Sequence, residues 1–254
     1  MVYILGGKTM RIQFICFVYN EIKYLPTAIK YYERNGCDVY VIDNMSDDGT
    51  WEWLQRERIP SHRFDTNGSF DLRLLQAEVM RTLDRLRPDW VIYGAADLFY
   101  VFPAGIKHSI HAIDALGFNL ISTDCYGALN TGEPEAVPLV GNFWYWKYWK
   151  RINMIGKWSR FYNMSGDNVM VPQTSIYKGR NMVVNFGGAK PAHEQEVKLQ
   201  RRQKAWDNGL KAATGRHYRA GKALDWLYEK DECIDVRMRP DLFEYVQQIL
   251  GTIK

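Results

Sequence analysis

The hydrophobic pattern of the first half of the chain predicts strands and helices in alternation. Residues 11–19 are rich in β-branched and aromatic side chains, which is typical of a buried strand. Apolar residues then recur at helical spacing over residues 25–32, and Asn35-Gly36 is a typical helix end. The next strand is expected at 39–42. Short connections between such elements favour parallel strands joined by right-handed crossovers.

The same alternation continues to residue 123. Six more elements are expected there: a helix from residue 51, a strand at 62–65, an amphipathic helix at 70–86, a buried strand at 90–93, a helix around 106–116 and a strand at 119–123.

From Tyr126 onward the pattern is weaker. Residues 127–140 look loop-like, and apolar stretches at 169–171 and 182–186 predict short strands. A charged helix is expected at 194–213 and a second C-terminal helix at 241–250. No linker composition separates these regions. We therefore expect one domain with an α/β half, 11–125, and a less regular region, 126–254.

Composition and charge narrow the class of protein. The 254 residues are 46% hydrophobic and 24% charged, as in a globular protein with a sizeable core. A formal net charge of +4 suits phosphate-bearing ligands but is too small to indicate nucleic acid. Four scattered cysteines without a CxxC pair favour a reducing compartment, so we expect a cytoplasmic protein. No apolar run approaches the ~20 residues that span a bilayer, and the N-terminus lacks a cleavable signal pattern.

Acidic side chains follow three of the predicted strands at the point where each strand ends. Glu21 comes after the first strand, Asp43 begins the turn after the second, and Asp97 follows the strand at 90–93. The carboxyl ends of parallel strands meet at one edge of a sheet, where ligands bind. We therefore expect these carboxylates to converge on one ligand.

The turn at 43–50 is the most polar of the three. Its Asn, Asp, Ser and Gly content predicts an exposed loop. Asp48 or Thr50 is available as the N-cap of the helix that follows. Capping alone is an alternative explanation for this turn.

Together these residues resemble glycosyltransferase family 2, nucleotide-sugar-dependent enzymes with the GT-A fold. The resemblance rests on FVYNE (17–21), NGCDVYVIDNMSDDGT (35–50) and DWVIYGAADLF (89–99), in the family's order. It covers roughly residues 11–102. It implies a GT-A-like α/β fold with a mostly parallel central sheet flanked by helices. It also implies a nucleotide-sugar-binding half, 11–125, and an irregular C-terminal acceptor-side region, 126–254.

The activity implied by the resemblance is transfer of a sugar, with inversion, from a nucleotide-diphosphate donor to a hydroxyl acceptor. UDP-linked donors are the default in the family, and the acceptor is a glycan or another hydroxyl compound. Asp43 is then expected to contact the nucleoside and Asp48 to shape the turn. The residues expected near the base and ribose are Phe17, Tyr19, Asn20 and Glu21.

The family's metal-binding DxD motif is degenerate in this chain. Where the family commonly has two aspartates, residues 95–97 read Ala-Ala-Asp, and Leu98 replaces an acid. The resemblance implies that Asp97 holds Mn²⁺ or Mg²⁺, with His193 as a second ligand, because a hard cation neutralises the diphosphate as it leaves. Alternatives are metal that arrives with the nucleotide, a metal-independent enzyme, or an inactive protein.

Other side chains could bind the diphosphate or act as the general base. Lys190, Arg201 and Arg202 are candidates for pairing with the diphosphate, although a Lys- and Arg-rich helix is often merely solvated. An inverting transfer needs a general base, and Asp167 is the first choice. The other carboxylates in the same part of the chain are Asp124, Glu133 and Glu135.

The segment 142–162 interleaves tryptophan and tyrosine with lysine and arginine. This composition suits an acceptor-glycan platform, a peripheral membrane contact or single-stranded nucleic acid. An irregular core filled by large side chains explains it equally well. The overall charge leads us to expect no nucleic-acid partner, and the oligomeric state is not predicted.

Two other functions are alternatives to a glycosyltransferase. A non-catalytic nucleotide- or sugar-binding protein would explain the loss of acids around Asp97. A nucleotidyltransferase is disfavoured, because that class opens with a Gly-rich basic loop after the first strand, where this chain has Asn20-Glu21.

Overall fold

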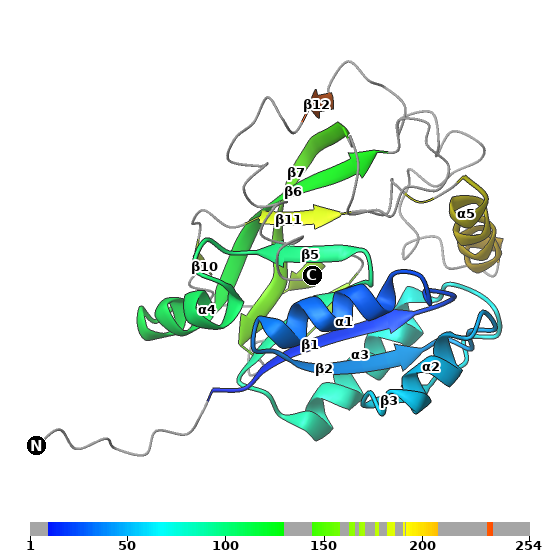
Figure 1. Ribbon diagram of the computed structural model, residues 1–254, viewed down its shortest axis with the longest axis horizontal. Helices are drawn as coiled ribbons and strands as arrows, with labels where there is room; N and C mark the ends of the chain where they lie inside the picture. Colours follow the sequence, from blue (N-terminus) through cyan, green and yellow to red (C-terminus); the bar gives the residue numbers. More distant parts are fainter. Residues whose placement is uncertain are drawn as a thin grey trace, which may run out of the picture.

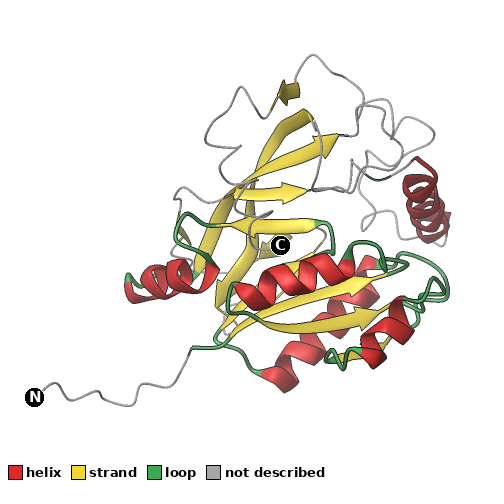
Figure 2. Ribbon diagram, in the orientation of Figure 1, coloured by secondary structure: helices red, strands yellow, loops and turns green. Residues whose placement is uncertain are grey.

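A large mixed sheet forms the centre of the structure, a computed structural model (Figures 1 and 2). The structure describes residues 10–129, 144–157, 163–165, 168–170, 176–177, 182–185, 190, 192–207 and 233–235. The strand order is β3-β2-β1-β4-β7-β6-β11-β5, with β10 beside β6 and β12 beside β7.

The first four strands of this order are parallel. β1 (Ile12–Val18) lies between β2 (Asp38–Asp43) and β4 (Trp90–Gly94), and β2 pairs with β3 (Ser61–Arg63). The connecting helices are α1 (Leu25–Arg34), α2 (Thr50–Arg56) and α3 (Leu72–Leu86). In Figure 1, α1 and α3 lie on opposite faces of β1. The strand order reverses between β1 and β4, which is the switch point where open α/β sheets bind ligands.

The rest of the chain, from residue 98 onward, extends the same sheet. It contributes β5 (Leu98–Val101), α4 (Ile106–Ala115), β6 (Leu120–Leu129), β7 (Trp144–Lys157), β10 (Ile176–Tyr177), β11 (Met182–Asn185) and β12 (Cys233–Asp235). β7 runs antiparallel to β4 and β6, and β11 runs parallel to β6 and antiparallel to β5. A separate hairpin pairs β8 (Asn163–Ser165) with β9 (Asn168–Met170). The last described helix is α5 (Ala192–Asp207).

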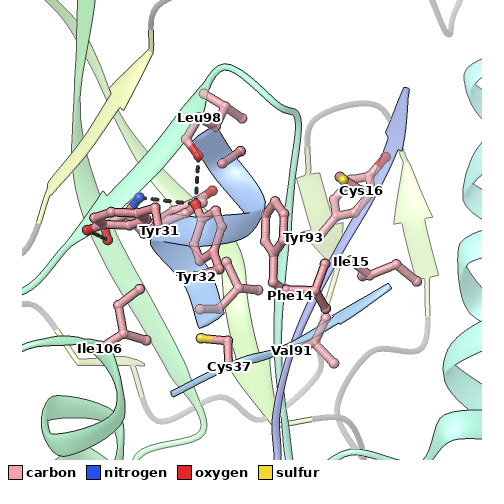
Figure 3. Close-up of a cluster of buried hydrophobic side chains, with 14 of the residues drawn as sticks. Phe14, Ile15, Cys16, Tyr31, Tyr32, Cys37, Val91, Tyr93, Leu98 and Ile106 are labelled. Carbon is pink, nitrogen blue, oxygen red and sulfur yellow. Dashed lines mark hydrogen bonds between the residues drawn. The ribbon is translucent and has the colours of Figure 1, made fainter. Parts of the chain in front are cut away.

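The core around α1 fixes the turn between β4 and β5 (Figure 3). The rings of Phe14 and Tyr32 stack with centroids 3.7 Å apart. The Tyr32 hydroxyl donates to the carbonyl of Leu98 at 2.6 Å, and the Tyr31 hydroxyl donates to the carbonyl of Tyr100 at 2.9 Å. Buried hydroxyls need such partners. These two bonds tie α1 to β5 and so hold the preceding residues, 95–97, near the end of β1.

The α/β fold class predicted from the sequence is confirmed, with a parallel N-terminal part flanked by helices. The expected helices and strands of residues 11–116 are present, and β11 matches the stretch predicted at 182–186. β6 continues through residues 125 and 126, where the two halves were expected to meet. Among the described residues, no helix is both long and apolar enough to cross a membrane.

Three expectations need correction. Residues 127–129 belong to β6 and are not loop, because they pair with β7 over the full length of β6. Residues 144–157 form one long strand, β7, which pairs with β6 with two register shifts. β5 was not predicted at all. The helix expected at 241–250, the end of the one expected at 194–213 and residues 130–140 lie outside the described residues.

Candidate functional site

The loops after β1 and β2 are joined by hydrogen bonds at the carboxyl edge of the sheet. The Asn20 amide donates to Asp47 at 2.7 Å and accepts from the Asp47 backbone at 3.0 Å, while the Asn20 backbone donates to Ser46 Oγ at 2.9 Å. Asn20 takes a left-handed conformation, φ 55°, which asparagine tolerates better than most residues. The backbone of Glu21 donates to Thr50 Oγ1 at 3.0 Å. The two loops therefore form one rigid unit.

Asp48 completes this unit but is not a helix cap. Its Oδ2 accepts from the Ile22 backbone at 3.1 Å, and its Oδ1 accepts from both the backbone and the hydroxyl of Thr50. The N-cap of α2 is Gly49, whose φ of 93° favours glycine. The expectation of Asp48 or Thr50 as N-cap is wrong, because Gly49 makes the left-handed step and Thr50 is already helical.

Asp43 is buried at the end of β2. Its Oδ2 accepts from Arg63 Nε at 3.0 Å and from the Ser46 backbone at 3.2 Å. Its Oδ1 is also buried and accepts no hydrogen bond from a described residue. The turn was expected to be exposed, and Met45, Asp47 and Asp48 are. Asp43, Asn44 and Ser46 are buried instead, because Arg63 and the loop after β3 cover them.

Asp97 and Lys190, both buried, and Glu21, partly buried, form a cluster at the β1–β4 switch point. Lys190 Nζ donates to both carboxylate oxygens of Glu21, at 2.6 and 2.7 Å, and lies 3.1 Å from Asp97 Oδ2. Lys198 Nζ lies 3.9 Å from the same oxygen of Asp97. Lys190 also lies over the ring of Tyr24, 4.5 Å from its centroid. Of the three carboxylates predicted to converge, Glu21 and Asp97 meet with a lysine ammonium between them, whereas Asp43 pairs with Arg63.

The electrostatics of this cluster keep Asp97 and Lys190 charged. Burial raises the pKa of Asp97, but the charges of Lys190 and Lys198 outweigh burial, so the pKa lies below its usual value. Burial lowers the pKa of Lys190, but Asp97 and Glu21 outweigh burial and raise it. For Glu21 burial dominates, and its pKa is raised despite the opposing charge of Lys190. The cluster is thus a buried ion network in which each group depends on the others.

Helix α5 docks on this edge through polar and charged groups. Glu194 accepts from Lys23 Nζ and from the Tyr24 hydroxyl, both at 3.0 Å. The guanidinium of Arg201 lies over the ring of Tyr19, 3.5 Å from its centroid. The backbone carbonyl of Arg201 accepts from the Phe70 backbone at 3.3 Å, which attaches α5 to the loop after β3. In Figure 1, α5 lies on the side toward which β1 and β2 point.

Several other predicted site residues lie outside the cluster of Glu21, Asp97 and Lys190. Phe17 packs against Phe70 and Tyr93, with centroids 5.6 and 5.9 Å away. His193 is exposed in the first turn of α5. In the part of the chain that the structure describes, no group of three or more His, Cys, Asp or Glu residues is placed to hold a metal ion. Asp167, Glu133 and Glu135 lie outside that part.

Sequence reasoning missed Arg63 and Lys198. Arg63 stands beside Asp43 in the parallel register of β2 and β3, so a correct strand alignment would have indicated the pair. Lys198 had no such signal, because it lies about a hundred residues from Asp97 on a helix rich in basic residues.

Comparison with known proteins gives structural likeness only. No family model matches the chain, and no curated protein sequence matches it. Among solved structures, TarS from S. aureus is 12% identical, with 96% of this chain and 49% of that chain covered and a TM-score of 0.48. TarS 1–349 in complex with UDP-GlcNAc is 13% identical, with 96% and 82% covered and a TM-score of 0.42.

A third structure is the glycosyltransferase GlyE of Streptococcus pneumoniae TIGR4. It is 18% identical, with 46% of this chain and 30% of that chain covered and a TM-score of 0.29. The chain thus spans about half the length of the first TarS structure. Because all three TM-scores are below 0.5, we base the function on the residues of this chain alone.

Proposed function

We propose that the chain is a glycosyltransferase that binds a nucleotide-diphosphate sugar, UDP-linked, at this edge and transfers the sugar to a hydroxyl acceptor with inversion. The observation that carries the proposal is the buried Oδ1 of Asp43, which accepts no hydrogen bond from a described residue. It lies at the end of a parallel strand next to the switch point. The three sequence motifs that resemble glycosyltransferase family 2 supply the loops around it.

A nucleoside would complete the hydrogen bonding of Asp43. Because Asp43 is fully buried, the nucleoside would have to displace the side chains that cover Oδ1. A buried carboxylate oxygen without a donor costs free energy, and the imide N–H of uracil or a ribose hydroxyl is such a donor. Arg63 and the Ser46 backbone already hold Oδ2, so the orientation of Oδ1 is fixed.

The reaction proposed is a direct displacement. The acceptor oxygen attacks the anomeric carbon, the bond from that carbon to the β-phosphate oxygen breaks, and its electron pair stays on the diphosphate. The acceptor's proton passes to a general base, for which Asp167 stays the prediction. Negative charge grows on the leaving group, so cationic groups near Asp97 stabilise the transition state.

The test is calorimetric titration with UDP, GDP and uridine, each with Mn²⁺ and with EDTA, followed by an assay for sugar transfer from UDP-sugars. We expect UDP to bind and to raise the thermal midpoint, since a ligand at a hundred times its Kd adds about 2.7 kcal/mol of stability. If neither nucleotide diphosphate binds under either condition, the proposal is wrong.

A second candidate function is a non-catalytic nucleotide- or sugar-binding protein. Ala95 and Leu98 favour it, because they replace acids of the family's metal-binding motif. Binding of UDP without hydrolysis or transfer of any UDP-sugar would support this candidate over the transferase.

A further inference from the structure

The cluster of Glu21, Asp97 and Lys190 is poorly suited to a divalent cation. Mg²⁺ and Mn²⁺ need oxygen ligands that are open to them, and Mg²⁺ demands near-octahedral geometry. Both oxygens of Glu21 accept from Lys190, and Oδ2 of Asp97 faces Lys190 at 3.1 Å and Lys198 at 3.9 Å. A dication beside Asp97 would also be repelled by these two ammonium groups. The described residues therefore do not fit the metal predicted for this position.

We infer that Lys190 takes the place of the metal as the fixed counter-ion of the two carboxylates, and that Lys198 binds the diphosphate of the donor. The inference rests on the proposed function. Lys190 Nζ donates to both oxygens of Glu21 and lies 3.1 Å from Asp97 Oδ2, so its ammonium is engaged in positioning these two carboxylates. Lys198 is 45% exposed and lies at the rim of the same cluster.

The charges of the cluster support these separate roles for Lys190 and Lys198. With both carboxylates ionised, Glu21, Asp97 and Lys190 carry a net charge of −1, which Lys198 neutralises. Lys198 and Arg201 are three residues apart on α5 and so share a face of the helix. A diphosphate that enters between α5 and the strand ends meets two cations on that face. Asp97 serves to hold the two lysines in place.

The first experiment separates phosphate binding from nucleoside binding. Kd values for UDP and uridine are measured by calorimetry for the wild type and for Lys198→Ala. The variant should weaken UDP about tenfold or more, as expected for loss of one charge-assisted contact, and leave uridine within about twofold. The control is Lys107→Ala, because Lys107 is exposed on α4 near Gly36, at the opposite edge of the sheet, and should change neither value.

The second experiment tests the counter-ion directly. Wild-type UDP affinity should agree within about twofold in EDTA and in Mn²⁺. Lys190→Ala removes the ammonium that covers Glu21 and Asp97, so this variant should bind Mn²⁺, as detected by electron paramagnetic resonance. Mn²⁺ should also raise the thermal midpoint of the variant. The wild type should show neither effect. The Lys198 and EDTA measurements decide the inference even where Lys190→Ala does not fold.

Two results would overturn the inference. One is a wild type whose UDP affinity falls tenfold in EDTA, and the other is Lys198→Ala binding UDP as the wild type does. Absence of binding of both uridine and UDP would instead overturn the proposed function and the role of Lys198 with it. Mn²⁺ binding by the wild type without nucleotide would still refute the counter-ion role of Lys190 in that case.

Discussion

Asp43 is the most completely buried carboxylate at the sheet edge, and only one of its oxygens receives hydrogen bonds from described residues. A buried charge that is half satisfied is unfavourable unless a ligand or another group completes it. Arg63 supplies the compensating charge and fixes the carboxylate's orientation. The stability of this turn and its affinity for a nucleoside should therefore respond to the same side chain.

Asp43→Asn keeps the size of the side chain but removes its charge. We expect the Kd for UDP and for uridine to rise tenfold or more, because a hydrogen bond to a charged group contributes about 1.5–3 kcal/mol. The free energy of unfolding should fall by roughly 1–3 kcal/mol, since Arg63 loses its partner. Calorimetry and urea denaturation measure the two effects.

The matched control is Asp38→Asn, at the other end of the same strand. Asp38 is exposed and, among the residues that the structure describes, its carboxylate pairs with exposed Arg11 at 3.3 Å, so its loss should change stability by about 1 kcal/mol at most. Equal nucleotide affinity in the two variants would contradict the role of Asp43.

Asp97 should make stability depend on pH in the acid range. Its folded pKa is lower than its usual value of 3.8, so its stabilising effect is fully present above about pH 4 and is lost as pH falls through the folded value. Asp97→Asn should cost roughly 2 kcal/mol at pH 7, and the difference from the wild type should shrink below pH 4. Urea denaturation of both proteins between pH 7 and pH 3 measures this.

Asp84→Asn is the control for that series, because Asp84 is exposed on α3. It should change the free energy of unfolding by no more than about 0.5 kcal/mol. A difference between wild type and Asp97→Asn that stayed constant with pH would show that Asp97 is not held ionised by the lysines.

At the scale of single residues, the sequence predicted which carboxylates gather but not what lies between them. Glu21 and Asp97 follow strands, so their position at one edge could be predicted from the pattern. Lys190 was predicted as a partner of the diphosphate, whereas in the structure it bonds to Glu21, 169 residues away. Long-range ion pairs of this kind follow from the packing of the whole chain and leave no local periodic signal.

At the scale of elements, a helix or strand was predicted correctly where its apolar residues follow a clear period. Helix α3 was predicted because its apolar residues follow the helical period, and its N-cap Asp71 accepts from two backbone amides. β5 was missed because four apolar residues directly after a turn carry no usable period. β7 was missed because aromatic and basic residues interrupt any alternation of apolar and polar positions in it.

At the scale of the whole molecule, topology determines where a ligand can bind. The β-α-β order of the first half predicted parallel strands, and the structure pairs β1 with β2 and β4 in that way. The antiparallel insertion of β7 between β4 and β6 could not be predicted, because it depends on a strand whose pattern was not recognised. The switch point is unaffected by this insertion, because it is formed by the order of β2, β1 and β4 alone.

This topology predicts a specific pattern of protection in hydrogen exchange. Uridine should slow exchange in the loops at 19–24 and 43–50, which the Asn20 and Asp48 bonds join into one unit. UDP should also slow exchange in residues 95–97 and in α5, because the diphosphate would bind Lys198, whose ammonium lies 3.9 Å from Asp97 Oδ2. α4, at the opposite edge, should not change with either ligand. Mass-spectrometric exchange with each ligand measures the pattern, and protection by UDP confined to α4 would place the site elsewhere. Equal protection of α5 by uridine and UDP would show instead that the helix contacts the nucleoside, and the division between nucleoside loops and a phosphate-binding helix would fail.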